Sequence, residues 1–304
     1  MKKMKISSGM ALDGGVMFAS KKYFVIAKYP KENPFDGLED KHPKKLDENG
    51  LEIITGKVDP PVGGKILNSI PFLAGIVSLL GGLISQNNRE PCKTVKGTNN
   101  SPAFTRIGVI LLTCGIVAIM AGCSYLIGSW LAGMFGVVEG TFWYGFLLSL
   151  MLSFICFAFP VGAAHFLQGD LLNFHGAEHK VGNALRKNLE LTKENVHTCS
   201  KFHIDCSTNL LVNNSIIYPF IAAFLYVWLG SFPLTILVSM IVAASIGTEL
   251  WRISTWIGEN FLGYVFNCFG ILTQKITVRD PEDRHVIAAI TAMNKLLEME
   301  QKNE

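Results

Sequence analysis

The sequence has no lysine or arginine between residues 107 and 169 or between residues 210 and 247. Charged residues make up only 17% of the 304-residue chain and apolar residues make up 49%, whereas a typical globular domain has about 25% charged residues. Stretches of this length with no basic residue and a single acid, Glu139, exclude an ordinary soluble domain and favour helices that cross a membrane. No nucleic-acid partner is expected, because the basic residues are interspersed with acids at the edges of the apolar stretches.

The N-terminus also lacks the apolar stretch of a cleavable signal peptide, so none is expected. The seven cysteines are odd in number and fall mostly in apolar segments or in basic loops. A disulfide framework is therefore not expected, and the thiols are predicted to be reduced.

Four segments are long and apolar enough to cross a hydrocarbon layer of about 30 Å, which needs about 20 helical residues. They are residues 107–135, 142–167, 210–229 and 233–247, of which the last can extend through residue 257. A fifth apolar run, 66–84, contains Pro71 and three glycines. This composition is typical of a helical hairpin that enters the membrane and returns, provided that protein shields its backbone.

The distribution of basic residues predicts the topology, because cytoplasmic loops are enriched in lysine and arginine. Twelve lie in residues 1–65, four in 85–106, five in 170–209 and six after residue 247, and none lies in 136–141 or 230–232. We therefore expect four spans in a bacterial inner membrane, with both termini cytoplasmic and 66–84 as a re-entrant or interfacial hairpin. Membrane lipids are the expected partners, and the sequence leaves open whether the chain forms a homo-oligomer.

The remaining segments predict small cytoplasmic elements. Residues 14–29 and 51–58 alternate as strands do. Residues 281–300 follow a helix-start signal centred on Asp280 and Pro281 and form an amphipathic helix. We expect its apolar face to pack against the β-unit or the other cytoplasmic loop and not on the membrane surface, because its polar face is not especially basic. The expected fold class is a mainly α membrane protein with a small β-unit and a C-terminal amphipathic helix. The expected segments are 1–65 (β-unit), 66–84 (hairpin), 107–167 (two spans), 168–209 (His/Cys loop), 210–257 (two spans) and 258–304 (C-terminal region).

A His-x-x-Glu-His pattern follows the second predicted span. On a helix, His175 and His179 lie four residues apart and share a face, which is how two imidazoles hold one Zn²⁺ ion. Glu178 is placed to accept a proton from a metal-bound water as a general base. The pattern therefore indicates a site for Zn²⁺ or another divalent metal, although interfacial histidines that bond carbonyls or lipid headgroups show the same spacing.

Three sets of residues could supply a third ligand. His203 and Cys206 form one pair in the same loop, and His197 and Cys199 form a looser pair. Glu249 is a carboxylate at membrane depth, where an acid is costly and is often functional, although Arg252 could simply neutralise it. Two other charged residues beside the motif, Lys180 and Lys187, are expected to be solvated or to face lipid.

Four ordered motifs resemble the YqhQ-like family of bacterial membrane proteins. They are FHGAEHK at 174–180, HIDCST at 203–208, TELWR at 248–252 and TVRDPED at 277–283. The chain departs from the family pattern at Gly14, where an acid is usual, and at Ser207, where glycine is usual. The family is described as predicted metal-dependent enzymes, so the resemblance implies a metal site but gives no substrate.

Two classes of function follow from these patterns. The first is a metal-dependent hydrolase that acts on a lipid or a peptide at the cytoplasmic face of the membrane. The second is a non-enzymatic scaffold, insertion factor or transport accessory, in which His175, His179, His203 and Cys206 close a structural metal site. A transporter is less favoured, because the spans show no clear inverted repeat.

Overall fold

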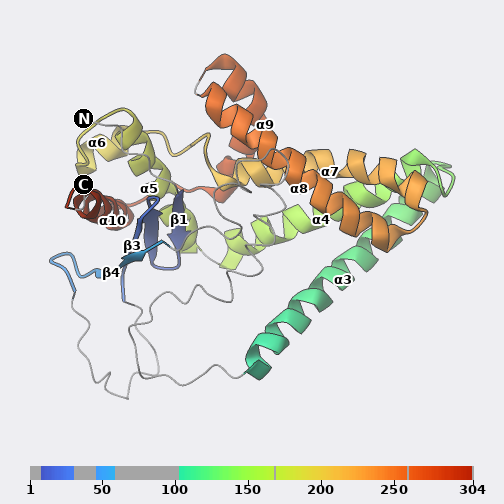
Figure 1. Ribbon diagram of the computed structural model, residues 1–304, viewed down its shortest axis with the longest axis horizontal. Helices are drawn as coiled ribbons and strands as arrows, with labels where there is room; N and C mark the ends of the chain where they lie inside the picture. Colours follow the sequence, from blue (N-terminus) through green and yellow to red (C-terminus); the bar gives the residue numbers. More distant parts are fainter. Residues whose placement is uncertain (1–7, 31–45, 59–102, 168, 259, 303–304) are drawn as a thin grey trace. The chain divides into compact units, whose positions relative to one another are not determined.

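The computed structural model describes residues 8–30, 46–58, 103–167, 169–258 and 260–302 (Figure 1). The chain forms two compact units. The sheet unit consists of Met1–Pro60, Val161–His203 and Ile271–Glu304, and the helical unit consists of Pro61–Pro160 and Ile204–Gly270. The hairpin predicted at 66–84 lies outside the described residues.

The sheet has four antiparallel strands in sequence order. They are β1 (Ser8–Leu12), β2 (Gly15–Ala19), β3 (Tyr23–Lys28) and β4 (Glu52–Lys57). The β1–β2 turn consists of Asp13 and Gly14, and the positive φ of Gly14 (81°) is one that glycine adopts without strain. The strands predicted within 14–29 and 51–58 are confirmed as β2, β3 and β4, whereas β1 was not predicted.

Three helices complete the sheet unit. They are α5 (Gly169–Arg186), α6 (Lys193–Thr198) and α10 (Asp283–Gln301). Helix α10 packs on β2, β3 and α5, and α5 packs on β1 and β2 (Figure 1). One apolar core joins all of these elements, so the N-terminal strands, the His/Cys loop and the C-terminal helix fold together.

The face predicted for the C-terminal helix is confirmed. Val286 and Met293 are fully buried, and Ile290 and Leu297 pack against the same core. The start of the helix differs from the prediction. Its N-cap is Glu282, whose side chain and that of His285 form a reciprocal capping box, so the cap is not Asp280.

The helical unit contains a helix at each of the four predicted spans. These are α3 (Ala103–Met134), α4 (Phe142–Leu167, whose last residues belong to the sheet unit), α7 (Ser207–Leu229) and α8 (Phe232–Ile257). Among the described residues, α7 and α8 are long and apolar enough to cross a membrane, and the apolar stretches Ala118–Met134 and Phe142–Ala158 are shorter. A further helix, α9 (Phe261–Thr277), follows α8.

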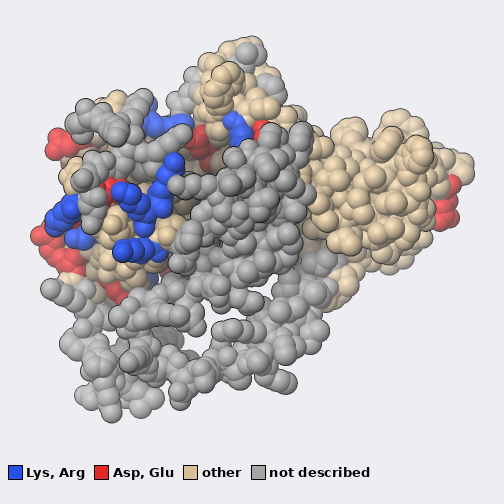
Figure 2. All heavy atoms as spheres, in the orientation of Figure 1, with Lys and Arg blue, Asp and Glu red and all other residues tan. Residues whose placement is uncertain are grey.

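The two units present different surfaces. On the face shown in Figure 2, charged side chains gather over the sheet unit, whereas the surface of the helical unit is almost uncharged. Large apolar side chains such as Phe224, Trp228 and Leu237 are exposed there. Large apolar side chains exposed in this way are typical of a surface that contacts lipid or another protein.

Candidate metal centre

Helix α5 carries both histidines of the His-x-x-Glu-His pattern on one face. The rings of His175 and His179 lie with their centroids 4.4 Å apart. The helix also has an apolar face that packs into the core of the sheet unit. Phe174, Ala177 and Val181 lie on this face and are buried. The core therefore fixes the rotation of α5, and that rotation sets the direction of the two imidazoles.

The N-terminal half of α5 is held by the segment that connects α9 to α10. The carbonyl of Thr277 lies 3.0 Å from His175 Nδ1, and the backbone N–H of Arg279 donates to the carbonyl of Leu172 at 3.0 Å. Gly176 makes this approach possible, since a Cβ there would lie 2.0 Å from the carbonyl oxygen of Arg279. The His-x-x-Glu-His pattern needs a glycine at this position because another backbone passes over it.

The C-terminal half of α5 holds the loop that carries the remaining candidate ligands. His179 Nδ1 lies 2.6 Å from the carbonyl of Lys201. Lys180 and Asn183 each donate to two further carbonyls of the loop, at 2.8–3.0 Å; the four acceptors are His197, Cys199, Ser200 and Phe202. The prediction that Lys180 is solvated or faces lipid is wrong, because its side chain is buried and its ammonium is satisfied by backbone oxygens.

Both imidazoles are poised as neutral ligands. A carbonyl can only accept a hydrogen bond, so Nδ1 of His175 and Nδ1 of His179 must carry the proton and each Nε2 keeps its lone pair. Burial lowers the pKa of His175, and it lowers the pKa of His179 well below the usual value, with neighbouring His175 and His203 adding to the effect. Nε2 of His179 is buried and has no hydrogen-bond partner among the described residues. Metal-binding histidines show this arrangement, with one nitrogen bonded to a carbonyl and the other available.

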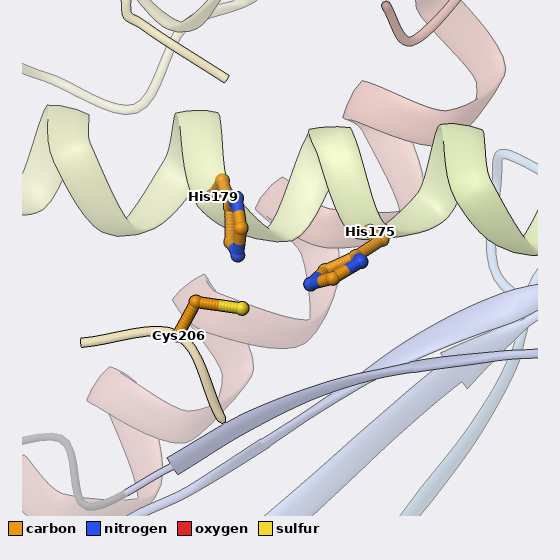
Figure 3. A group of neighbouring side chains, drawn as sticks. All are labelled: His175, His179 and Cys206. Atoms are coloured by element: carbon orange, nitrogen blue, oxygen red, sulfur yellow. The ribbon is translucent and has the colours of Figure 1, made fainter. Parts of the chain in front are cut away.

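The structure brings Cys206 to these histidines. The ligand atoms of His175, His179 and Cys206 all lie within 4.8 Å of one another, and Figure 3 shows one nitrogen of each ring directed toward the sulfur. Cys206 is buried and is the N-cap residue of α7. A helix N-terminus favours negative charge and hence the thiolate form that binds metals.

The other candidate ligands have different partners in the structure. Glu249 accepts a hydrogen bond from Arg252 at 3.1 Å. Arg252 is the residue that the sequence suggested as the neutralising partner of this carboxylate. His197 is paired with Asp283 at 3.0 Å on the surface, and Cys199 is buried in the apolar core. Neither these residues nor Glu249 belongs to the ligand group found among the described residues.

His203 lies next to the group without belonging to it. Its ring centroid is 5.6 Å from that of His179, and burial together with Arg186 lowers its pKa to about 4. Gln274 in α9 fixes its backbone, because the amide accepts from the His203 N–H and donates to the His203 carbonyl, both at 2.9 Å. His203 is therefore a neutral imidazole on a fixed backbone, and its ring lies beside that of His179.

Glu178 points into the sheet unit against β1. Its carboxylate accepts a hydrogen bond from the backbone of Ala11, and it occupies the space above Gly9, where a Cβ would lie 2.3 Å from Oε1. Burial raises the pKa of Glu178 to about 8. Sequence reasoning missed this contact because it missed β1, although the Asp13-Gly14 pair was a hairpin signal that could have revealed the strand.

The raised pKa of Glu178 predicts a pH dependence of stability. The unfolded carboxyl ionises near pH 4.5 and the folded one near pH 8, so the folded state binds more protons in this window and stability falls as pH rises through it. The loss is of the order of 4 kcal/mol. In the presence of a metal chelator, the stability of the Glu178→Gln variant should not fall with pH in this way. The variant should therefore unfold at a higher temperature than the wild type near pH 8, but not near pH 5. Parallel pH profiles for the two proteins would show that the carboxyl is not buried in this way.

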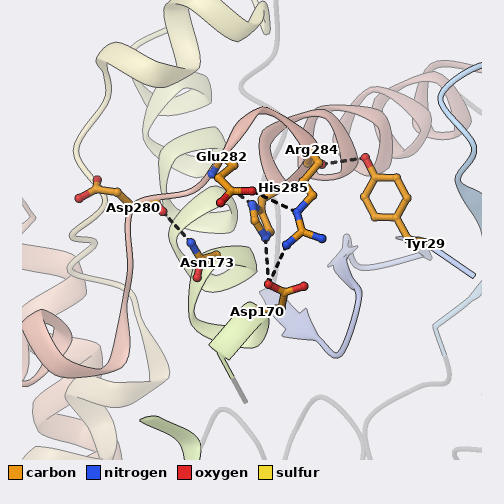
Figure 4. Close-up of polar contacts among 7 residues, drawn as sticks. All are labelled: Tyr29, Asp170, Asn173, Asp280, Glu282, Arg284 and His285. Atoms are coloured by element: carbon orange, nitrogen blue, oxygen red, sulfur yellow. Dashed lines mark hydrogen bonds and ion pairs between the residues drawn. The ribbon is translucent and has the colours of Figure 1, made fainter. Parts of the chain in front are cut away.

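A polar junction joins the N-termini of α5 and α10 (Figure 4). Arg284 donates to Asp170 at 2.8 Å and to Glu282 at 3.3 Å, and Tyr29 donates to the carbonyl of Arg284 at 3.0 Å. Asn173 donates to the carbonyl of Asp280 at 2.8 Å. These contacts hold in place the chain that follows Thr277, whose carbonyl forms the hydrogen bond with His175. The junction therefore helps to position the candidate centre although none of its residues belongs to the centre.

Comparison with known proteins supports the expected resemblance. The model of a family described as "Protein of unknown function (DUF1385)" matches residues 70–299, which include every candidate ligand but not the four strands. The chain is also 29% identical over 141 residues to the uncharacterized protein YqhQ of Bacillus subtilis, a match that covers 44% of this chain and 42% of that protein. The chain thus matches less than half of the length of this relative. No solved structure matches. The chain belongs to the DUF1385 family.

Proposed function

We propose that this DUF1385 member is an integral membrane protein that binds Zn²⁺, or another divalent metal, through His175, His179 and Cys206, and that it hydrolyses a lipid or a peptide at the cytoplasmic face of the membrane. One observation carries the proposal: the buried Nε2 of His179, which has no hydrogen-bond partner in the part of the chain that the structure describes, lies beside a second imidazole and a thiol. A polar atom buried without a partner is costly, and a bound metal would remove that cost.

The type of ligand favours zinc and the number of ligands favours catalysis. Imidazole and thiolate together suit Zn²⁺ better than Mg²⁺ or Ca²⁺, which prefer oxygen ligands. Three protein ligands leave a fourth position for water, as in catalytic zinc sites, whereas structural sites have four. The neutral state of both histidines also favours binding, since no proton must be removed from them.

The membrane location is supported by the helices and by the charges. Helices α3, α4, α7 and α8 coincide with the four predicted spans. The basic residues of the sheet unit then lie on the cytoplasmic side, with both termini. The candidate centre belongs to the segment between the second and third spans, so in this topology it would lie at the cytoplasmic face of the membrane.

Glu178 is the proposed acid–base residue. Its pKa of about 8 allows proton exchange near neutral pH, which is the property of a general acid or base. A bound metal would supply an activated water and polarise the scissile carbonyl or phosphoryl group. The hydrogen bond from Ala11 and the contact with Gly9 would fix the orientation of the carboxyl against β1.

Cobalt substitution tests the ligand set. Purified protein loaded with Co²⁺ should show a thiolate-to-cobalt charge-transfer absorption, because Cys206 is proposed as a ligand. The Cys206→Ser variant should lose this band, and the Cys199→Ser variant should keep it, because Cys199 lies in the apolar core. A band that depends on Cys199, or no band in the wild type, would contradict the assignment.

A comparison of membranes tests the hydrolase activity. Cells that express the wild type, Glu178→Gln or His179→Asn at equal levels should differ in one class of lipid or membrane peptide, which accumulates in both variants. Mass spectrometry of total membrane extracts measures this difference. Identical profiles for the three strains would count against hydrolysis while leaving the metal site untouched.

The alternative is a closed structural site in a non-enzymatic scaffold or accessory protein. The observation that favours it is the 5.6 Å separation of the His179 and His203 rings, which makes His203 available as a fourth ligand. The His203→Ala variant distinguishes the two: zinc is retained if three residues bind it and is lost if the site is closed by four.

A further inference from the structure

Helix α9 has its polar and apolar faces reversed relative to a soluble helix. The side chains of Asn267 and Gln274 are buried, at 1% and 0% exposure. On the outside, large apolar side chains are exposed by half or more of their area; these are Phe261, Val265, Phe269, Leu272 and Ile276. Burial of polar groups with exposure of apolar ones is opposite to what water favours.

The inward face of α9 is fully used for packing and hydrogen bonding. Asn267 donates to the carbonyl of Gly263, and its oxygen lies 3.5 Å from the hydroxyl of Ser254. Gly270 lies against Asn209, and Gln274 holds the backbone of His203. The helix therefore cannot rotate to bury its apolar face without breaking these contacts.

Charge indicates what the outward face contacts. The sequence of α9 has no charged residue before Lys275, close to its C-terminal end. An exposed helix in water normally carries charged residues on its outer face. Helix α9 also follows α8, a helix long enough to cross a membrane, after only three residues. With 17 residues, α9 is shorter than the roughly 20 needed to span.

We propose that α9 lies in the cytoplasmic interface of the membrane, with its outward face among the lipid acyl chains. This inference rests on the membrane location proposed above, but not on the metal. Because the same helix holds His203 through Gln274, contact with lipid fixes the depth of the loop that carries the candidate ligands. A substrate would then reach the centre from the lipid headgroup region.

Spin labels measure this placement directly. In full-length protein reconstituted in liposomes, exposed cysteines 123, 156 and 268 and the cysteines at 92 and 114 are replaced, and buried Cys199 and Cys206 are kept. Single labels are introduced at Phe269, Leu272 and Ile276. Labels at Leu237 in α8 and at Glu194 in α6 serve as the lipid and water references. Collisions with oxygen and with a water-soluble nickel chelate are then compared.

The three α9 labels should resemble the Leu237 label, with a ratio of oxygen to nickel collisions several-fold above that at Glu194. Labels that resemble Glu194 would show an outward face in water, and labels shielded from both reagents would show a second copy or another protein on it. Either result overturns the inference. If Leu237 also resembles Glu194, the membrane location itself fails, so the two failures are distinguishable.

Discussion

Replacement of His179 by asparagine is expected to abolish zinc binding while the protein stays folded. The amide of asparagine can donate to the Lys201 carbonyl as Nδ1 does, but it offers nothing in place of Nε2. Loss of a hydrogen-bonding partner outside the ligand set already costs about 10–100-fold in metal affinity, so loss of a ligand should cost at least about 100-fold. Zinc content after dialysis against a weak chelator measures the effect.

The matched control is His197→Asn. This histidine lies on the same loop, but it is exposed and paired with Asp283, so the variant should retain the wild-type amount of zinc. Unfolding temperatures of the metal-free proteins establish that both variants fold. Retention of zinc by folded His179→Asn protein would remove His179 from the ligand set.

Gly176→Ala should be among the most destabilising single-methyl additions in the sheet unit. The new Cβ would lie 2.0 Å from the carbonyl oxygen of Arg279 and 3.2 Å from Pro281 Cδ. To remove this overlap, α5 would have to move away from the segment at Thr277–Arg279, which includes the hydrogen-bond partner of His175. Overpacking of this kind costs about 3 kcal/mol, and we expect weaker zinc binding as well, because the Thr277–His175 hydrogen bond depends on the same segment.

Gly182→Ala is the control in the same helix. Among the described residues, its Cβ would meet the His203 ring alone, at 3.5 Å, which is an ordinary contact. This variant should therefore equal or slightly exceed the wild type in stability, since alanine favours a helix by up to about 1 kcal/mol over glycine. Equal unfolding temperatures for the two variants would show that the segment does not pass over Gly176 as the structure has it.

Much of the fold could be predicted because its signals are local. The thickness of a bilayer sets the length of an apolar helix, so the helices at 107–135, 142–167, 210–229 and 233–257 could be located from composition alone. Strands β2, β3 and β4 carry the alternation of a half-buried sheet. Strand β1 is short and half exposed, and its defining contact, with Glu178, joins residues far apart in the sequence.

The grouping of the candidate side chains could be predicted in part from the sequence, but the residues that support them could not. The spacing of His175 and His179 places them together on any helix, and Cys206 belonged to one of the three sets of residues that could supply a third ligand. The burial of Lys180 could not be predicted, because its partners are backbone carbonyls, which leave no signature in the sequence. Glu249 was a candidate because an acid at membrane depth is often functional, yet it pairs with Arg252, only three positions away.

The central claim is that His175, His179 and Cys206 hold a zinc ion. The most direct measurement is the zinc content of detergent-purified wild-type protein combined with X-ray absorption at the zinc edge. We predict about one zinc per chain, with two nitrogen ligands at about 2.0 Å, one sulfur at about 2.3 Å and an oxygen from water. Absence of a stoichiometric metal, or a metal shell without sulfur, would contradict the account.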